Sequence, residues 1–371
     1  MGGQDLIMKK VALFLLIIML TACTSEKEQA PVNQKDKQEA RETNQSENRK
    51  VIAENLDIPW NITKVEEVED TFYLSQRGGS IQQVDGETGR TVLQNINVTK
   101  DIVHAGEGGF LGFILAPDFE STNEALAYHT YEQEGSLYNR VIRLQLQEDT
   151  WVETGILLEG IPGGQIHNGG RLKIGPDQKL YVTTGDAGEA DLAQDLHSLG
   201  GKILRMELDG SIPSDNPFSN SYVYSYGHRN PQGLAWDKNG QLYSTEHGQT
   251  AHDEINRIEP GNNYGWPVIQ GDEEKAGMIP PFYHTGNTTW APSGIDSRKG
   301  KLYIAALRGT KIIAFDINTK EQTVIYDQGD RVRDIFIQND SLYAITNNRD
   351  GRGTPKEGDD RLMKINLETE G

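Results

Sequence analysis

The chain contains very little cysteine and few basic residues for its size. Cys23 is the single cysteine in 371 residues, which excludes disulfide bonds within the chain and any cysteine-rich metal site. The 36 lysines and arginines are outnumbered by 55 acidic residues, and the formal net charge is −19. Because a protein that binds nucleic acid needs clustered lysine and arginine, nucleic acid is not an expected partner.

Long apolar segments and convincing amphipathic helices are also missing. Only 36% of the residues are hydrophobic, whereas 40 are glycine and 14 are tyrosine. A composition of this kind favours short strands joined by polar turns over long helices. We therefore predict an all-β fold.

The longest uninterrupted apolar run, residues 11–20, follows Lys9 and Lys10. A run of about ten residues is too short to span a bilayer but suits the core of a signal peptide. The next segment, Leu20-Thr21-Ala22-Cys23, resembles the bacterial lipoprotein box, with ordinary cleavage and an incidental cysteine as the alternative. We predict a lipoprotein signal peptide over residues 1–23 with a lipid on Cys23. The protein is then expected to be exported and lipid-anchored to the bacterial cell membrane, facing outside the cytoplasm.

The segment that follows is almost entirely polar. Residues 24–50 are mostly Glu, Lys, Gln, Asn, Asp and Ser. Such a segment cannot bury enough surface to offset its ordering entropy, so we predict a disordered tether. The folded domain is expected over residues 51–371.

One short motif recurs within residues 51–371. An apolar or aromatic residue precedes a tyrosine, and a glycine or polar turn and then an alternating, strand-like segment follow. The spacing is roughly 40 to 60 residues, as in propeller blades with insertions. The motif predicts a six-bladed β-propeller with four-stranded antiparallel blades; a β-sandwich or a solenoid of hairpins is the alternative. The six tyrosines are Tyr73, Tyr128, Tyr181, Tyr243, Tyr303 and Tyr343.

Two polar segments suggest proton transfer and anion binding. His167 stands among glycines, where a ligand can approach closely, and an imidazole can accept a proton near neutral pH. Asp186 follows in Thr-Gly-Asp-Ala-Gly and could hydrogen-bond that imidazole. Arg229 offers a rigid fork of donors for an oxyanion or a planar ring, and Asn230 offers an amide. Each of these residues could instead belong to an ordinary turn.

Residues 246–254 and 261–267 mix carboxylates, turns and accessible backbone carbonyls. Oxygen ligands of this kind suit calcium. Zinc is a competing interpretation because of His247 and His252, but no third histidine lies at matching spacing.

A set of arginines suggests an anionic ligand. Arg331 and Arg333 are two residues apart and point to the same face if they lie on a strand, and Arg308 precedes them. In an acidic protein, these cations suggest a ligand with several carboxylates, although a surface ladder of salt bridges is the alternative. No nucleophile elbow or phosphate-binding loop is present in the sequence, so hydrolysis through a serine and phosphoryl transfer are poorly supported.

Five segments occur together in an order that resembles the soluble glucose/sorbosone dehydrogenase family, the quinoprotein aldose sugar dehydrogenases. The resemblance extends from about Asn55 to Asn366. The segments that carry it are Gly-Glu-Gly-Gly-Phe-Leu-Gly at 106–112, His-Asn-Gly-Gly-Arg-Leu at 167–172, Gly-His-Arg-Asn-Pro-Gln-Gly at 227–233, Asp-Glu-Ile-Asn at 253–256 and Ala-Pro-Ser-Gly at 291–294.

The resemblance implies a six-bladed propeller that holds pyrroloquinoline quinone (PQQ) and Ca²⁺ on its axis, with an aldose as substrate and an external electron acceptor. His167 would take the hydroxyl proton as hydride moves to the quinone, and Asp186 would orient His167. Arg229 would stabilise the charge that develops on a quinone oxygen. The other residues implied at the cofactor are Glu107, Asn230, Arg308, Arg331 and Arg333.

Calcium would occupy two places by the same resemblance. Backbone carbonyls of Gly248 and Gln249 would hold the catalytic ion, and Glu254 with the backbone of Tyr264 would hold a structural one.

Trp290 is either a platform on which a sugar stacks or a buried structural tryptophan.

The chain departs from the family at three of these positions. Gln249 stands where relatives often have proline, Arg308 where some have lysine, and Glu107 where some have glutamine. The last change adds negative charge near an anionic cofactor. A calcium-dependent lactonase and a non-catalytic carbohydrate-binding propeller remain as alternative functions.

Overall fold

The computed structural model describes residues 48–65 and 70–367. The predicted signal peptide, Cys23 and nearly all of the predicted tether lie outside these ranges. The all-β prediction is confirmed, since the described helices are only α2 (Phe119–Thr122) and the 3₁₀-helix η1 (Ala190–Ala193). No helix in these ranges has the length and apolar character needed to cross a membrane. The first strand, β1, begins at Arg49, two residues before the predicted domain boundary.

Four of the described sheets have four strands each, all antiparallel. The first combines the two ends of the described chain, in the order β1 (Arg49–Ala53), β24 (Leu362–Asn366), β23 (Ser341–Thr346) and β22 (Val332–Gln338). The second contains β10 (Leu172–Ile174), β11 (Leu180–Thr184), β12 (Lys202–Met206) and β13 (Val223–Tyr226). The third contains β14 (Pro231–Trp236), β15 (Leu242–Glu246), β16 (Glu254–Ile258) and β17 (Tyr283–His284). The fourth contains β18 (Pro292–Arg298), β19 (Lys301–Ala306), β20 (Lys311–Asp316) and β21 (Gln322–Tyr326).

The fifth sheet has eight strands and consists of two antiparallel units of four. β5 and β9 join the two units edge to edge in parallel. The first unit contains β2 (Pro59–Lys64), β3 (Thr71–Gln76), β4 (Ser80–Asp85) and β5 (Thr91–Asn97). The second contains β6 (Phe110–Leu115), β7 (Glu124–Gln133), β8 (Ser136–Gln147) and β9 (Thr150–Pro162).

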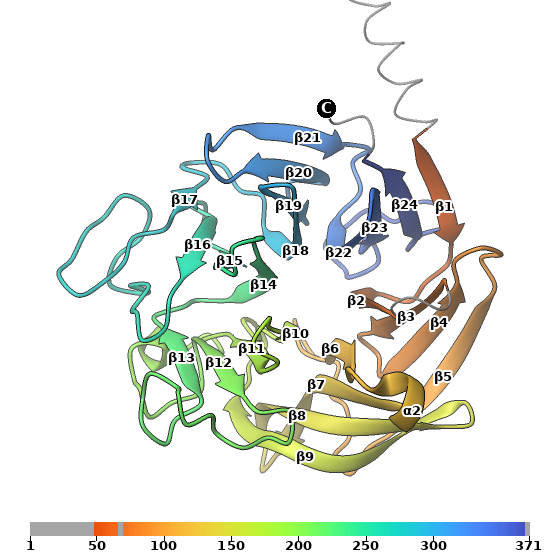
Figure 1. The fold of residues 1–371 in the computed structure, drawn as a ribbon, viewed down its shortest axis with the longest axis horizontal. Helices are drawn as coiled ribbons and strands as arrows, with labels where there is room; N and C mark the ends of the chain where they lie inside the picture. Colours follow the sequence, from red (N-terminus) through yellow and green to blue (C-terminus); the bar gives the residue numbers. More distant parts are fainter. Residues whose placement is uncertain (1–47, 66–69, 368–371) are drawn as a thin grey trace, which may run out of the picture. The chain divides into compact units, whose positions relative to one another are not determined.

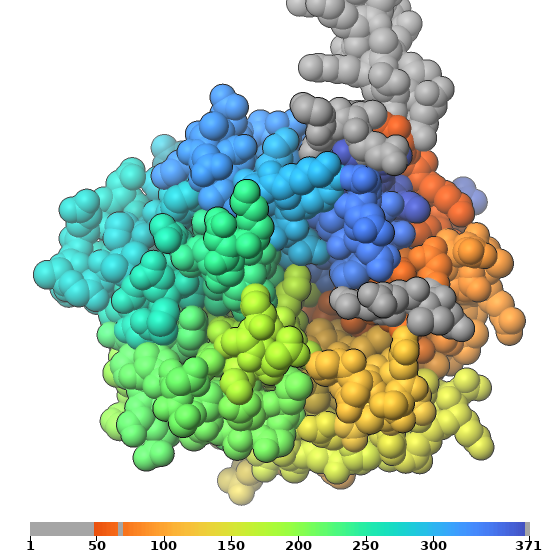
Figure 2. Space-filling view, in the orientation of Figure 1, coloured from red at the N-terminus to blue at the C-terminus, as the bar shows by residue number. Residues whose placement is uncertain are grey.

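The six four-stranded units surround a common centre in chain order (Figure 1). Contacts between elements close the circle. β2 contacts β6 and β22, β6 contacts β10, β11 contacts β14, β14 contacts β18, and β18 contacts β22. In the space-filling view, the segments likewise follow one another around the molecule, with the last segments of the chain beside the first ones (Figure 2). This closed arrangement differs from both a sandwich and an open solenoid.

The recurring tyrosine marks the same place in every unit. Each of the six lies on the second strand of its unit, that is, on β3, β7, β11, β15, β19 or β23. Each also lies in a different one of the six buried apolar clusters, and each cluster joins neighbouring units. The motif seen in the sequence is therefore the contact surface between consecutive units.

We call the first strand of each unit, which lies nearest the common centre in Figure 1, its central strand. The antiparallel order places two kinds of loop at one end of the central strands. The loop before the first strand of a unit and the loop after its second strand lie at the same edge of the sheet. His167 belongs to the first kind, before β10, and Asp186 to the second, after β11. The sheet thus brings together side chains that are 19 residues apart in the sequence.

Candidate active site

His167 and Asp186 form a buried pair. His167 Nδ1 lies 2.7 Å from Oδ1 of Asp186, and the two residues are 8% and 1% exposed. Nε1–H of Trp266 donates to the other carboxylate oxygen at 2.8 Å, and the Gly188 N–H donates to Oδ1 at 2.8 Å. Burial alone raises the pKa of Asp186, but the hydrogen bonds from these groups outweigh it and lower the pKa. An ionised Asp186 holds the proton of the imidazole on Nδ1 and leaves Nε2 as the acceptor.

The backbone at His167 adopts a conformation that few residues other than glycine take. Its φ is +58°, in the left-handed region. The neighbouring loop approaches so closely that a Cβ on Gly185 would lie 2.0 Å from the His167 carbonyl oxygen. Only glycine fits at 185, because a side chain there would collide with the His167 backbone.

Glu107 connects His167 to Arg352, which lies on the opposite side of the site; we call this end of the central strands the mouth. One carboxylate oxygen accepts the His167 N–H at 2.8 Å, and the other lies 2.7 Å from Nη1 of Arg352. Burial raises the pKa of Glu107, but the His167 N–H and the charge of Arg352 outweigh it and lower the pKa to about 2. Glu107 is therefore ionised and paired. We call His167, Asp186 and Glu107 the base side of the site.

Arg229 and Asn230 are held in place by a buried carboxylate. Glu246 accepts the N–H groups of both residues and also bonds Nδ1 of His228 at 2.9 Å. The Arg229 guanidinium lies 5.4 Å from the centre of the Trp266 ring, and its Nη1 donates to the His247 carbonyl at 3.2 Å. Burial lowers the pKa of Arg229. The main chain is thus anchored, whereas Nε of Arg229 and Nδ2 of Asn230 are buried without a partner in the described part of the chain.

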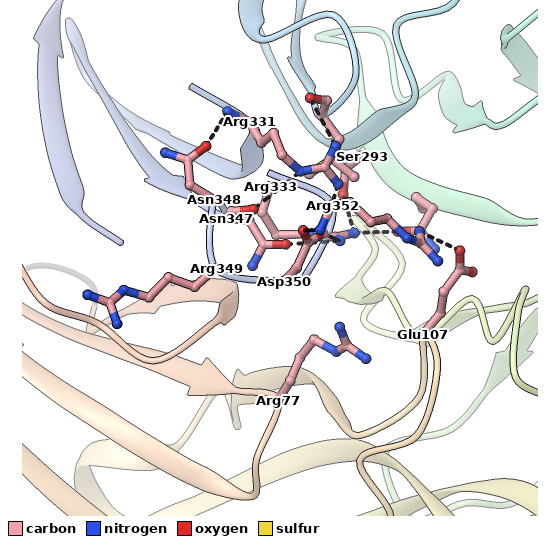
Figure 3. A network of polar contacts seen from close by, with 12 residues as sticks. Arg77, Glu107, Ser293, Arg331, Arg333, Asn347, Asn348, Arg349, Asp350 and Arg352 are labelled. Atoms are coloured by element: carbon pink, nitrogen blue, oxygen red, sulfur yellow. Dashed lines mark hydrogen bonds and ion pairs between the residues drawn. The ribbon is translucent and has the colours of Figure 1, made fainter. Parts of the chain in front are cut away.

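Arg333 and Arg331 meet at Asp350, as Figure 3 shows. Arg331 Nη2 lies 2.8 Å from Oδ2 of Asp350, whereas Arg333 Nη2 is 3.9 Å from the same oxygen. Arg333 is 7% exposed and donates to Gln232 at 3.0 Å, and burial lowers its pKa to about 9. Both arginines thus approach the same carboxylate, although Arg331 lies just before β22 and not on the strand that the prediction assumed.

Two small cavities lie at this end of the central strands. Cavity A is lined by Trp60, Arg77, Glu107, Asn168, Gly169, Gln232, His247, Leu307, Arg333, Asp350 and Arg352. Cavity B is lined by Arg229, Glu246, His247, Gly248, His252, Glu254, Tyr264, Trp266, Ile269 and Gln270. His247 lines both. The base side adjoins cavity A through Glu107 and cavity B through Trp266.

Several buried nitrogen atoms at these cavities have no hydrogen-bond partner in the described part of the chain. Leaving a buried polar group unpaired costs roughly 1–3 kcal/mol. Eleven buried side-chain nitrogen and oxygen atoms of the described residues lack a partner; four are nitrogen atoms of residues that line these cavities, and a fifth is Nδ2 of Asn230, next to Arg229. We call the residues of these five nitrogen atoms the acceptor side, because the atoms lack a hydrogen-bond acceptor: Arg77, Arg229 and Arg333 (Nε), Asn230 (Nδ2) and His247 (Nε2). A planar ligand with several carboxylates would supply the missing acceptors, so the residues fit PQQ.

The segment predicted to bind the catalytic calcium is ordered by Asp253. Its carboxylate accepts the Gly248 N–H at 3.0 Å and the N–H groups of Trp290 and Ala291 at 2.6 and 2.8 Å. Gly248 lines cavity B, whereas Gln249 is exposed and is not among the lining residues. The structure therefore places only the first of the two predicted carbonyl ligands beside a cavity.

The place predicted for a structural calcium ion contains oxygen atoms that lack a counter-charge. Burial, with the nearby charge of Glu246, raises the pKa of Glu254 to about 8. Asn256 donates to Glu254 at 3.0 Å, and its own Oδ1 is buried without a partner. Both Glu254 and Tyr264 line cavity B. A hard cation that prefers oxygen ligands fits this donor set.

Other sequence interpretations find less support. Arg308 is exposed and lines neither cavity. Trp290 is 6% exposed and stacks on Tyr283, so it is a structural tryptophan rather than a sugar platform. Zinc is not supported, since no group of three or more His, Cys, Asp or Glu side chains suited to a metal occurs in residues 48–65 and 70–367.

Sequence reasoning missed four residues that the structure places at the site: Arg77, His247 as a lining residue, Trp266 and Arg352. Arg77 follows β3 and donates to the Gly108 carbonyl at 2.8 Å. It is the cation before the Gly78-Gly79 turn in the first copy of the repeat. That position in the repeat was the available signal. Arg352, in contrast, lies in the β23–β24 loop, where no local pattern distinguishes it from its charged neighbours.

Known proteins resemble this chain both in sequence and in structure. A sequence profile of the Glucose / Sorbosone dehydrogenase family matches residues 56–356. Quinoprotein glucose dehydrogenase B of Acinetobacter calcoaceticus is 37% identical over 266 residues, which are 62% of this chain and 54% of that protein. The aldose sugar dehydrogenase YliI of Escherichia coli is 28% identical over 341 residues, 82% of this chain and 91% of that protein.

A solved structure extends the similarity to three dimensions. The PQQ-bound form of aldose sugar dehydrogenase from Streptomyces coelicolor superimposes with a TM-score of 0.80 and 37% identity. The match covers 86% of this chain and 97% of that one. The chain thus spans about half the length of the Acinetobacter protein, but nearly all of the Escherichia and Streptomyces proteins.

Proposed function

Because the chain belongs to the glucose/sorbosone dehydrogenase family, we propose that it oxidises aldose sugars to lactones with PQQ and passes the electrons to an external acceptor. The family relatives are named oxidoreductases, and one of them is a PQQ-bound structure. One observation carries the proposal. An imidazole oriented by an ionised carboxylate, His167 with Asp186, is bonded to one lining residue of each cavity, Glu107 in cavity A and Trp266 in cavity B. Buried donors at these cavities have no partner among the described residues.

The residues that would hold the cofactor come from three of the six units, those whose first strands are β2, β14 and β22. Arg77, Arg333, Arg229 and Asn230 present unpaired nitrogen atoms, and His247 lies between the two cavities. Trp60 offers a flat apolar surface in cavity A, with the Arg333 guanidinium 5.9 Å from its ring. When bound, PQQ supplies the hydride acceptor and its calcium ion supplies a Lewis acid.

The chain's own residues would handle the proton and the charge. His167 Nε2 would accept the proton of the sugar hydroxyl at the carbon that loses hydride. Asp186 would stabilise the imidazolium, and Trp266 and Gly188 hold Asp186 in place. Arg229 would place a fixed positive charge near the bound ring, where negative charge develops. These groups are preorganised, so little rearrangement accompanies the reaction.

Calcium is part of the proposal at two places. The carbonyls of Gly248 and Gln249 are the proposed ligands of the catalytic ion. Glu254 and the backbone of Tyr264 are the proposed ligands of the structural ion, supported by the raised pKa of Glu254 and the unpaired oxygen of Asn256.

We also propose that the six units are the blades of a six-bladed propeller, with β1 completing the last blade. The lipid anchor at Cys23, export and attachment to the bacterial cell membrane remain proposals that rest on the sequence. The test is globomycin treatment of cells that produce the protein. Globomycin should cause the unprocessed form to accumulate, and normal processing in its presence would contradict the anchor.

The test of the function uses the purified chain with calcium, PQQ, glucose and a redox dye. We expect bleaching of the dye that requires both calcium and PQQ and is lost in His167→Ala. His197→Ala is a matched control, because His197 is an exposed histidine outside both cavities. Lactone hydrolysis without PQQ would favour the calcium-dependent lactonase. The absence of both activities, with no PQQ binding, would favour a non-catalytic carbohydrate-binding propeller.

A further inference from the structure

Glu107 introduces a negative charge where the proposed ligand is itself an anion. Its carboxylate lines cavity A, and its side chain is 21% exposed. Because the carboxylate accepts the His167 N–H at 2.8 Å, it also helps to hold the left-handed backbone of the proposed base. Position 107 therefore needs a hydrogen-bond acceptor, and the chain uses one that carries a charge.

Arg352 supplies the opposite charge from the other side of the mouth. Its Nη1 lies 2.7 Å from Oε1 of Glu107, although the two residues are 245 positions apart in the sequence. The Arg352 backbone N–H donates to Asp350 at 2.9 Å, which fixes the loop from which the side chain extends. Figure 3 shows Arg352 between Arg333 and Glu107. The pair thus joins the β23–β24 loop to the segment before β6.

The balance of charge around cavity A depends on this pair. The lining contains three arginines, Arg77, Arg333 and Arg352, and two carboxylates, Glu107 and Asp350. The lining therefore has one positive charge in excess. Without Arg352 the lining would be neutral, and the Glu107 carboxylate would lose the cation with which it pairs. An unpaired charge in a partly buried site acts far more strongly than in water.

We propose that Arg352 is the counter-ion that makes a glutamate compatible with anion binding at position 107, and that this pair tunes the affinity for the triply acidic cofactor. The inference rests on the proposed function. Arg352 is a positioning residue: it acts through Glu107, which holds the base. Together, Glu107 and Arg352 accept the His167 N–H without adding net charge, as a neutral glutamine at position 107 would do alone.

The test is a double-mutant cycle on the full chain, with the Kd for PQQ measured by isothermal titration calorimetry in the presence of calcium. Arg352→Gln should weaken PQQ binding about tenfold, because Glu107 loses its counter-ion. Glu107→Gln should bind PQQ at least as tightly as the wild type, since the amide oxygen still accepts the His167 N–H. The double variant should return to within about threefold of the wild type. Arg352→Lys, which keeps the charge, should also stay within about threefold.

Arg257→Gln is the matched control, because it removes an arginine from an exposed ion pair that lines neither cavity. Thermal unfolding of each variant without cofactor separates a loss of affinity from a loss of fold. Wild-type affinity in Arg352→Gln would overturn the inference while leaving the proposed function intact. So would a double variant as weak as Arg352→Gln. Failure of the wild type to bind PQQ would overturn the proposed function, and this inference with it.

Discussion

The base side and the acceptor side of the site differ in how completely their polar groups are satisfied. On the base side, both oxygens of Asp186 and both oxygens of Glu107 accept hydrogen bonds from within the chain. On the acceptor side, buried nitrogen atoms of Arg229, Arg333 and three other residues have no partner in the described part of the chain.

The difference shows which half of the site is complete before a ligand arrives. Within the described residues, the carboxylate oxygens of the base side are all paired, so their geometry does not depend on a ligand. The unpaired buried donors of the acceptor side cost free energy that a bound anion would offset. Substitutions of His167 and Asp186 should therefore affect turnover, and substitutions on the acceptor side should affect binding.

The largest expected effect is that of His167→Ala. Loss of the proton acceptor should lower kcat/KM for glucose about 1,000-fold. The Kd for PQQ should change less than about threefold, because His167 is not among the unpaired donors. Stopped-flow reduction of the preloaded enzyme and calorimetric PQQ binding check the two halves of the prediction. A variant that loses PQQ binding in proportion to turnover would break the distinction between the two sides.

Asp186→Asn should have the next largest effect. Both carboxylate oxygens accept N–H groups, so an amide NH₂ must face a donor or the imidazole Nδ1. A proton forced onto Nε2 would remove the base, and kcat/KM should fall about 100-fold with PQQ affinity unchanged. Trp266→Phe is the control, since it removes one bond from Asp186 and leaves the bond to His167; its loss should be smaller. Equal losses in the two variants would contradict this account.

Arg333→Met sharpens the comparison from the acceptor side. Burial lowers the pKa of Arg333 to about 9, so the buried cation costs free energy in the absence of a ligand. We expect the Kd for PQQ to rise about 30-fold while the Tm of the cofactor-free protein changes little. Differential scanning calorimetry and titration calorimetry measure both values. A large fall in Tm with unchanged affinity would make Arg333 a structural residue.

The remaining prediction concerns stability in acid, not turnover or binding. The folded-state pKa of Glu107 is about 2, below its ordinary value of 4.5. A depressed pKa contributes stability above the ordinary value, and this contribution is lost as the pH falls from 4.5 toward 2. Between pH 4.5 and 2, the free energy of unfolding of Glu107→Gln should therefore fall by up to about 3 kcal/mol less than that of the wild type. Urea unfolding of the wild type and the variant at several pH values tests this, with the exposed Glu259→Gln as control. Parallel pH profiles for Glu107→Gln and the wild type would contradict it.

Much of the fold could be predicted because the repeat is local. An apolar-tyrosine pair before a turn marks a strand wherever it occurs, and all six copies became second strands. The parallel contact of β5 with β9 was not predictable, since it depends on how far the long strands β8 and β9 extend. The pairing of β1 with β24 was not predictable either, because no local signal links the two ends of a chain.

The residues of the site also divide into those that the sequence could predict and those that it could not. His167, Asp186, Arg229 and Asn230 lie in glycine-rich segments whose backbone restrictions are visible in the sequence. Arg352 lies in an ordinary charged loop and acquires its importance only when the fold brings Glu107 to it. Arg308 has the residue type of a cofactor ligand, but it points to solvent.

The pairing of β1 with β24 has a consequence for how the chain can assemble. Residues 49–53 are synthesised long before their neighbours at 362–366. Loop-closure entropy makes such distant pairings slow, and the circle stays open at least until β24 has been made. A chain cut short before residue 362 leaves both β1 and β23 with an unpaired edge, open to association with other chains.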